Sequence, residues 1–135
     1  MFLLDTDTVI YILKNHPTVI ANLDRHRMDP MGICSVTTME LYYGAYKSQS
    51  VSANLSKVKR LVSALEMFSV EGACIEVFAM LKAELEAAGN RLDDFDLLIG
   101  ACGLSNGLTL VTNNVRHFAR INGLKLANWM EKVQE

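Results

Sequence analysis

The chain has 135 residues, half of them hydrophobic, and a formal net charge of −2 at pH 7. This length and composition fit a single domain, residues 1–135, with one ordinary buried core, and leave too little chain for a second. The near-neutral charge gives no overall electrostatic case for binding nucleic acid, although a balanced total is compatible with an acidic pocket beside a basic rim.

The cysteines and the apolar runs of the sequence indicate the cellular compartment in which the protein is expected. The three cysteines, Cys34, Cys74 and Cys102, are odd in number and far apart in apolar surroundings, so the sequence predicts neither a disulfide framework nor a zinc site. The N-terminus has no basic segment ahead of its apolar stretch, and no later run is long enough to cross a bilayer. We therefore expect a cytoplasmic protein that makes no contact with a membrane.

Short apolar runs alternate with longer stretches of helical periodicity. The runs FLL, GICSV, MFSV and LTLVT predict four buried strands, and a short last strand is expected at 124–127. Helices are expected at 8–14, 18–27, 37–48 and 52–65, then along the face of Val77, Met80, Leu81 and Leu85 up to Gly89, and from 93 to Gly107. The order β-α-α-β-α-α-β-α-α-β, with the short strand last, predicts an α/β fold with a mostly parallel sheet covered by helices.

Three carboxylates from distant segments are predicted to meet at one edge of this sheet. Asp5 ends the first strand, Glu40 follows the second strand in the first turn of a helix, and Asp96 lies in the first turn of the helix that begins DDFDLLIG. Open parallel sheets bind ligands at the carboxyl ends of their strands. Carboxylates about 4 Å apart repel by about 1 kcal/mol in water and roughly 4 kcal/mol at an effective dielectric of 20. A hard divalent cation such as Mg²⁺ relieves that repulsion, so the arrangement predicts a metal site.

Each acid also has a purely structural interpretation. Asp5 could end its strand in an Asx-turn, and Asp96 could help to start its helix. Thr37 and Glu40 have the S/T-x-x-E spacing of a capping box, which on its own is as good an explanation as a site. Asp7 is expected to be the N-cap of the 8–14 helix. The joint arrangement, more than any one residue, favours the site.

Four stretches in order resemble the motifs of PIN-domain ribonucleases, specifically the VapC-type toxins: LLDTDTVIYILK, SVTTMELYYGA, DDFDLLIGACG and LVTNNVRHFARINGLKLANW. The resemblance covers nearly the whole chain. It implies a single-domain three-layer α/β/α sandwich and Mg²⁺- or Mn²⁺-dependent endonuclease activity on structured RNA, often tRNA. It also implies a homodimer and neutralisation by a small cognate antitoxin. By motif position, Asp5, Glu40 and Asp96 would be the catalytic, metal-binding triad.

The chain departs from the family pattern at one place. Many PIN domains carry a fourth acid two residues after the Thr that follows the fourth strand, whereas here Thr112 is followed by Asn114. An amide brings no charge, so we expect one tightly held ion. Asp7, Thr112 and Asn114 are retained as accessory site residues.

The remaining polar and aromatic residues give weaker signals. Lys14, Arg116 and Arg120 are candidates for RNA backbone contacts, although any one of them could equally be a solvated surface charge. The three Tyr residues after Glu40, at 42, 43 and 46, are expected in the core or a dimer interface rather than under RNA bases. The three His residues, at 16, 26 and 117, are expected at the surface and not as general bases.

Two other function classes fit parts of the sequence. A haloacid-dehalogenase-like phosphatase would use the D-x-D at the end of the first strand, with Asp5 as nucleophile and Asp7 as acid/base. That alternative lacks a Gly-Thr after the second Asp and leaves Glu40 without a role. A non-catalytic RNA- or protein-binding module would not need three mutually repelling acids, and it should not be stabilised by Mg²⁺ or Mn²⁺.

Overall fold

A five-stranded sheet lies at the centre of the protein. The computed structural model describes residues 1–132, and in it the strands have the order β3-β2-β1-β4-β5, with every neighbouring pair parallel. The strands are β1 (Phe2–Leu4), β2 (Met31–Cys34), β3 (Glu66–Phe68), β4 (Thr109–Val111) and β5 (Lys125–Ala127). The predicted α/β fold with a mostly parallel sheet is confirmed. The last three residues of the predicted domain, 133–135, lie outside the described residues.

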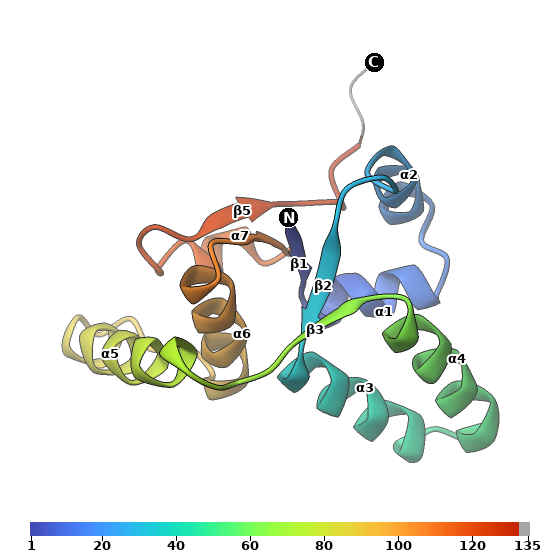
Figure 1. Cartoon of the computed structure of the whole chain (residues 1–135), viewed down its shortest axis with the longest axis horizontal. Coiled ribbons are helices and arrows are strands. Elements are labelled where there is room, and N and C mark those ends of the chain that lie inside the picture. The colour runs from blue at the N-terminus through green and yellow to red at the C-terminus, as the bar shows by residue number, and fades with distance from the viewer. Residues whose placement is uncertain (133–135) are drawn as a thin grey trace.

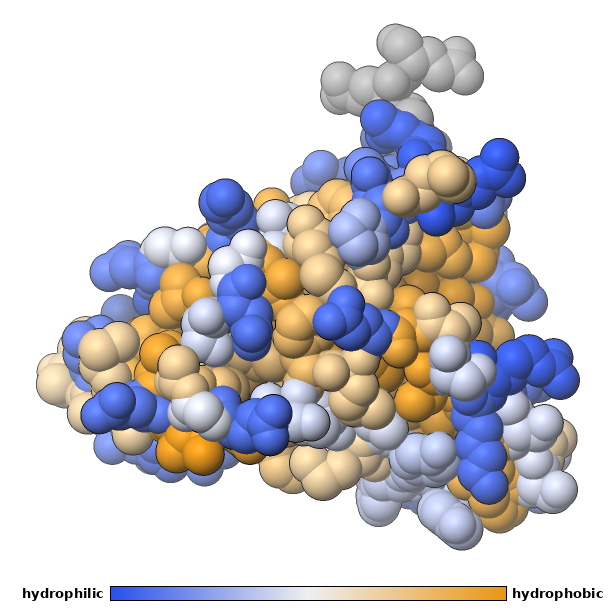
Figure 2. Space-filling view, viewed as in Figure 1, coloured by the Kyte–Doolittle hydropathy of each residue, from blue (hydrophilic) through white to orange (hydrophobic). Residues whose placement is uncertain are grey.

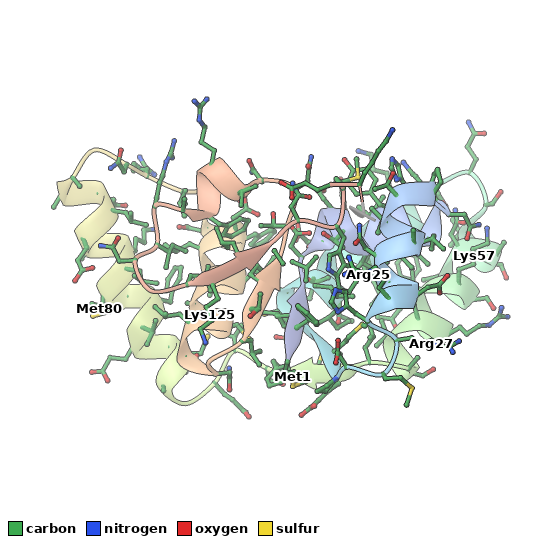
Figure 3. The ribbon with its side chains drawn as sticks, turned by 90° about the horizontal axis from the view of Figure 1, so that it is seen from above. Met1, Arg25, Arg27, Lys57, Met80 and Lys125 are labelled. Carbon is green, nitrogen blue, oxygen red and sulfur yellow. The ribbon has the colours of Figure 1, made fainter. Side chains whose placement is uncertain are left out.

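Helices cover both faces of the sheet, as Figure 1 shows. They are α1 (Thr6–Leu13), α2 (Pro17–Arg25), α3 (Ser35–Lys47), α4 (Val51–Ser63), α5 (Ala73–Ala87), α6 (Asp94–Ser105) and the short α7 (Val115–Phe118). Seen from above, α5 with Met80 and α4 with Lys57 lie at opposite ends of the molecule (Figure 3). The expected three-layer sandwich is therefore present.

The central strand β1 divides the core in two because successive side chains of a strand point to opposite faces. Leu3 packs in a cluster with residues of α5 and α6, whereas Leu4 packs in a second cluster with residues of α1, α2, α3 and α4. Both leucines are fully buried. Full burial fixes the register of β1 and so fixes the position of Asp5, the next residue.

Two helix starts differ from the predictions and matter for the site. Helix α1 begins at Thr6 instead of 8, and α3 begins at Ser35 instead of 37. In both cases the chain turns into the helix directly from the end of a strand. The short helix α7, which follows Asn114, was not predicted.

Glycines serve two separate purposes in the fold. Gly89 and Gly107 follow α5 and α6 with φ of 71° and 65°, which confirms them as helix terminators. Gly32 of β2 allows a close approach of β3, because a Cβ there would lie 2.8 Å from the carbonyl oxygen of Glu66 and 2.6 Å from the Phe68 ring.

The chain order of the strands creates a switch point beside β1. From β1 the chain proceeds outward to β2 and β3, then returns to the other side of β1 to form β4. The connections after β1 and β4 therefore diverge, and this switch point at the carboxyl ends of the strands is where open parallel sheets bind ligands. Asp5 follows β1 and Thr112 follows β4, so both residues lie at the switch point.

Candidate active site

Asp5 is the most deeply buried acid of the site. It is 5% exposed and is the N-cap of α1, with Oδ1 accepting a hydrogen bond of 2.8 Å from the Thr8 backbone N–H. Desolvation by burial raises the pKa of the Asp5 carboxyl, and hydrogen bonds from Thr112 and Thr8 offset part of that rise. The carboxyl is thus a helix cap rather than an Asx-turn, and it is held in a place where its charge is poorly solvated.

Asp7 does not have the role predicted for it. Because α1 starts at Thr6, Asp5 takes the N-cap position, and Asp7 lies exposed in the first turn. Its remaining effect on the site is electrostatic, since its charge contributes to the raised pKa of Asp5.

Glu40 approaches from α3, but from its second turn and not its first. The capping-box interpretation of Thr37 and Glu40 is wrong, because α3 starts two residues before Thr37 and its N-cap is Cys34. The Thr6 hydroxyl instead lies 2.7 Å from Glu40 Oε1 and 3.1 Å from the hydroxyl of Thr37, which is fully buried. Since a hydroxyl has one proton, we assign the donation from Thr6 to the shorter contact with Glu40. Thr6 therefore orients Glu40.

Asp96 lies in the first turn of α6, as predicted, and Asp93 is the N-cap of that helix. Desolvation by burial raises the pKa of Asp96; the neighbouring charge of His117 lowers it, and the charges of Asp93, Glu40 and Asp5 raise it. Glu40 and Asp5 therefore act electrostatically on Asp96. The structure brings the three predicted acids into one neighbourhood.

Thr112 and Asn114 complete the floor of the site. Thr112 is fully buried, its Oγ1 accepts a hydrogen bond of 2.9 Å from the Asn114 backbone N–H, and its hydroxyl hydrogen bonds to Asp5. The Asn114 side chain is exposed at the N-cap of α7 and makes no capping hydrogen bond. It is thus free to face a ligand but brings no charge.

His117 was predicted at the surface and is instead a neighbour of the site. Its Nε2 lies 3.2 Å from Oδ2 of Asp96, and the His117 side chain is 24% exposed. The Nε2 atom itself is buried and not aligned for a hydrogen bond. No sequence signal pointed to this contact, because it depends on α7, a four-residue helix. The other two His residues are half-buried, with His16 at the N-cap of α2 and His26 stacked on Trp129.

The donor atoms of the site fit a hard divalent cation, which prefers carboxylate oxygens. Asp5, Glu40 and Asp96 bring three negative charges, Asp5 is almost fully buried, and the neighbouring His117 does not compensate all of this charge. As the side chains stand, however, no group of three or more His, Cys, Asp or Glu residues within 1–132 is arranged to hold an ion. Glu40 is turned to Thr6, and Asp96 to His117. Binding an ion would require these two side chains to rotate toward Asp5.

The predicted basic residues lie in three different settings. Lys14 is exposed at the C-cap of α1, and Arg116 is exposed on α7. Arg120 donates from Nη1 to the Arg91 carbonyl oxygen at 3.0 Å. On the face seen in Figure 2, hydrophilic side chains are spread between hydrophobic ones instead of forming one patch.

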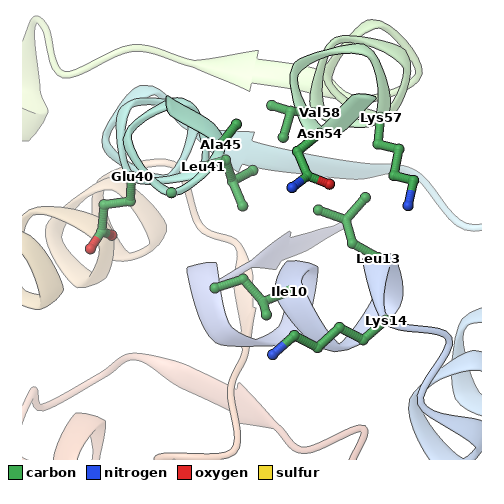
Figure 4. Close-up of a pocket in the computed structure, with 10 residues that line it drawn as sticks. Ile10, Leu13, Lys14, Glu40, Leu41, Ala45, Asn54, Lys57 and Val58 are labelled. Carbon is green, nitrogen blue, oxygen red and sulfur yellow. The ribbon is translucent and has the colours of Figure 1, made fainter. Parts of the chain in front are cut away.

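A groove of about 400 Å³ runs from the site between α1, α3 and α4. Figure 4 shows Ile10 and Leu13 of α1 facing Leu41 of α3 and Val58 of α4, with Glu40 at one end. The residues that line the groove are mainly apolar, with two lysines and one amide among them: Ile10, Leu13, Lys14, Glu40, Leu41, Gly44, Ala45, Asn54, Lys57 and Val58. The groove was not predicted, because it depends on how three helices pack.

Comparison with known proteins identifies the family. The PIN domain family matches residues 2–124. The chain belongs to the PIN-domain family. It is 37% identical over 128 residues to a tRNA(fMet)-specific endonuclease VapC of Shigella flexneri, a match that covers 95% of this chain and 97% of that one. It is 35% identical to Ribonuclease VapC2 of Haemophilus influenzae, over 96% of this chain and 98% of that one.

Solved structures agree with this assignment. The structure of VapBC2 from Rickettsia felis bound to a promoter DNA fragment contains a chain with a TM-score of 0.88 and 34% identity, covering 95% of this PIN domain and 98% of that chain. The protein is thus a VapC-type ribonuclease, a toxin of the toxin–antitoxin class, and the phosphatase and non-catalytic alternatives are set aside. Within residues 1–132 no helix is long and apolar enough to cross a membrane.

Proposed function

We propose that this PIN domain is an endoribonuclease that depends on Mg²⁺ or Mn²⁺ held by Asp5, Glu40 and Asp96. The observation that carries the proposal is the convergence of three acids from three distant segments at the switch point of the sheet, with burial raising the pKa of Asp5 and of Asp96. A protein maintains such poorly compensated charges at a cost, and functional sites are where that cost is usual. The cation, when bound, supplies charge for the scissile phosphate and acidifies a water.

The chain's own residues would orient this chemistry. Thr8 and Thr112 fix the Asp5 carboxyl between α1 and β4, and Thr6 limits the rotation of Glu40. With Asn114 in place of a fourth acid, the donor set carries three formal charges, which suits one ion better than two.

We propose structured RNA, and tRNA in particular, as the substrate. The Shigella relative is named a tRNA(fMet)-specific endonuclease, and the two chains align over nearly their full lengths. Lys14 and Arg116, exposed on α1 and α7, are the candidates for phosphate contacts near the site. Arg120 is a weaker candidate, because its guanidinium already binds a backbone carbonyl.

The apolar groove is our candidate docking site for a small antitoxin. The Rickettsia relative was solved as a VapBC2 assembly. An amphipathic helix from a partner would bury the half-exposed side chains of Ile10 and Leu13, and a partner Arg or Lys at the end of the groove could pair with Glu40. The substitution Leu13→Glu should release the co-expressed partner, whereas Met28→Glu, at a site 89% exposed, should not.

We also propose a homodimer that uses one face of α3. Met39, Tyr43 and Tyr46 are 57%, 65% and 66% exposed and follow helical spacing. Of the two settings expected for the Tyr residues, core or dimer interface, Tyr43 and Tyr46 are therefore outside the core, whereas Tyr42 is half-buried and packs against it. Sedimentation analysis of Tyr43→Glu should detect a shift toward monomer. An unchanged sedimentation coefficient would count against this face.

RNA cleavage by purified protein tests the main proposal. Wild type should cut RNA with Mn²⁺ or Mg²⁺ and stop in chelator, while Asp5→Asn, Glu40→Gln and Asp96→Asn should lose most activity. Asp24→Asn, an exposed acid on α2, is the matched control and should remain active. Cleavage that continues undiminished in chelator would refute the metal dependence.

In cells, expression should arrest growth unless the antitoxin is co-expressed.

A further inference from the structure

Three thiols from distant segments meet in one part of the core, away from the acids. Cys34 ends β2, Cys74 lies in the first turn of α5, and Cys102 lies in α6. They are 0%, 2% and 0% exposed, belong to the same hydrophobic cluster and are all unbridged. Nothing in the proposed ribonuclease reaction uses them.

Cys34 and Cys102 both lie beside Phe68 of β3. Cys34 stands directly opposite Phe68 of β3, and the Cys102 Sγ lies 3.9 Å from the Phe68 carbonyl oxygen. The two thiols are also close enough for each to shift the pKa of the other. A pair of neighbouring thiols inside one packed cluster is the starting geometry for a disulfide.

The two thiols differ in reactivity. The contact with Cys102 lowers the pKa of the Cys34 thiol to about 7; burial opposes this effect, and the backbone N–H groups of Val36 and Thr37 at the start of α3 add to it. The same contact and burial raise the pKa of the Cys102 thiol. Of the two thiols, Cys34 therefore ionises more readily and is the one that peroxide would oxidise first, and Cys102 is the neighbour placed for the second step.

A route for a small oxidant leads to this cluster. A recess of about 350 Å³ beside it is lined in part by Phe68, Cys74 and Asn106. Asn106 Nδ2 lies 3.9 Å from the Cys102 Sγ, so the recess ends one side chain away from the pair. Asn106 is exposed, and exposed side chains change rotamer within picoseconds to nanoseconds, so its motion can open the recess toward the pair for a small oxidant such as hydrogen peroxide.

The position of the pair connects it to the acidic site. Cys34 is the N-cap of α3, the helix that carries Glu40, and Cys102 belongs to α6, the helix that carries Asp96. A covalent bond between the two cysteines would pull the start of α3 toward the last turn of α6. Packed cores do not absorb such a shift locally, so the separation of the two carboxylates would change.

We propose that Cys34 and Cys102 are a peroxide-responsive thiol pair whose oxidation to a disulfide lowers ribonuclease activity by displacing Glu40 relative to Asp96. Hydrogen peroxide transfers one oxygen to the Cys34 thiolate, giving the sulfenic acid and hydroxide. The Cys102 sulfur then attacks the Cys34 sulfur, the S–O bond breaks, and water leaves with the Cys102 proton. The two electrons lost by the two sulfurs reduce the peroxide. The effect on activity rests on the proposed function, but the thiol chemistry does not.

Mass spectrometry of the full-length, metal-free protein tests the chemistry. After hydrogen peroxide treatment, wild type should lose the mass of two hydrogen atoms and two of its three free thiols, and non-reducing proteolysis should yield the Cys34 peptide joined to the Cys102 peptide. Cys74→Ser should still form this bond, whereas Cys34→Ser and Cys102→Ser should not. The wild-type peptide map gives the answer even if a variant folds poorly. Three thiols that survive peroxide, or a bond that includes Cys74, would overturn the proposal.

Activity assays separate this inference from the proposed function. Oxidised wild type should cut RNA several-fold more slowly than the reduced protein, and dithiothreitol should restore the rate, while Cys102→Ser should be insensitive to peroxide. An oxidised protein that bears the disulfide and cuts at the full rate would overturn the link to Glu40 and Asp96. If the reduced protein does not cut RNA at all, the proposed function fails, and the mass spectra still decide the thiol chemistry.

Discussion

The substitution Asp5→Asn should make the metal-free protein more stable while it removes the response to metal. Asn and Asp are equally good N-caps, so an Asn side chain can keep the 2.8 Å hydrogen bond from the Thr8 N–H and the contact with Thr112. What changes is the charge. Asp5 is 5% exposed, and its ionised form is disfavoured first by desolvation and then by the charge of Asp7.

The size of the effect follows from opposing contributions. Desolvation of the buried Asp5 carboxylate is the largest contribution, and the charge of Asp7 adds to it. On the scale of like-charge repulsion, about 1 kcal/mol in water and roughly 4 kcal/mol at an effective dielectric of 20 for charges about 4 Å apart, we take the whole penalty as about 3 kcal/mol. Losing a negative charge at the start of α1 costs about 0.3–1 kcal/mol, and the new amide N–H₂ must find an acceptor, at a cost of about 1 kcal/mol. The net gain is about 1–2 kcal/mol, which corresponds to a rise in Tm of about 3–8 °C for a chain of this length.

Thermal unfolding followed by circular dichroism, in chelator and in Mn²⁺, measures both effects. In chelator Asp5→Asn should melt above wild type, and Mn²⁺ should raise the Tm of wild type but not of the variant. Asp24→Asn, an exposed acid of α2, should match wild type in both conditions. A metal-free Asp5→Asn that melts below wild type would show that the charge of Asp5 stabilises the fold, and the reasoning would be refuted.

Four further predictions follow from the same contacts. Thr6→Val removes the hydrogen-bond donor to Glu40, so it should lower the free energy of unfolding by about 1–2 kcal/mol and the RNA cleavage rate by tenfold or more. Thr6→Ser keeps the hydroxyl and should retain both the stability and the cleavage rate of wild type. Asp96→Asn should melt above wild type in chelator, and saturating Mn²⁺ should narrow or reverse that order; a plainly less stable metal-free variant would make Asp96 a structural helix-start residue. Asn114→Asp adds a negative charge beside the acids at an equally good N-cap, so it should lower the stability of the metal-free protein and enlarge the rise in Tm that Mn²⁺ produces. The same rise in Tm for wild type and Asn114→Asp would exclude position 114 from the metal site. Because the pKa values of Asp5 and Asp96 are raised in the folded protein, their ionisation destabilises the metal-free fold at neutral pH. Urea titrations should therefore find that the difference in unfolding free energy between Asp5→Asn and wild type shrinks as the pH falls through the raised pKa of Asp5. A difference that does not depend on pH would contradict the raised pKa of Asp5.

The sequence predicted the features that depend on local pattern. Alternation of apolar runs and helical periodicity was enough to predict the parallel sheet, and Asp5 was placed correctly because Leu3 and Leu4 are unmistakably a buried strand. Asp96 was placed correctly because the acids before it mark a helix start.

The errors occurred where tertiary contacts decide local structure. Thr37 and Glu40 have a capping-box spacing, but α3 starts two residues earlier because β2 ends at Cys34, and Thr37 is then drawn into the core beside Thr6. Asp7 lost the N-cap position to Asp5 for the same reason, since α1 begins directly after β1.

His117 illustrates a second limit of sequence reasoning. Helix α7 has four residues, which is too short for a periodic pattern, so nothing in the sequence indicated that it would turn His117 toward α6. The apolar groove likewise needs α1, α3 and α4 in their packed positions before its lining residues become neighbours.

Anomalous diffraction from crystals grown with Mn²⁺ tests the central claim most directly, because it locates the ion without relying on activity. The proposal predicts a single strong anomalous peak at the carboxyl edge of β1, within bonding distance of carboxylate oxygens of Asp5 and Asp96, with Glu40 rotated away from Thr6 toward it. The same crystals of Asp5→Asn should lack the peak. A wild-type map with no peak there, or with its only peak elsewhere, would contradict a metal site built from these three acids.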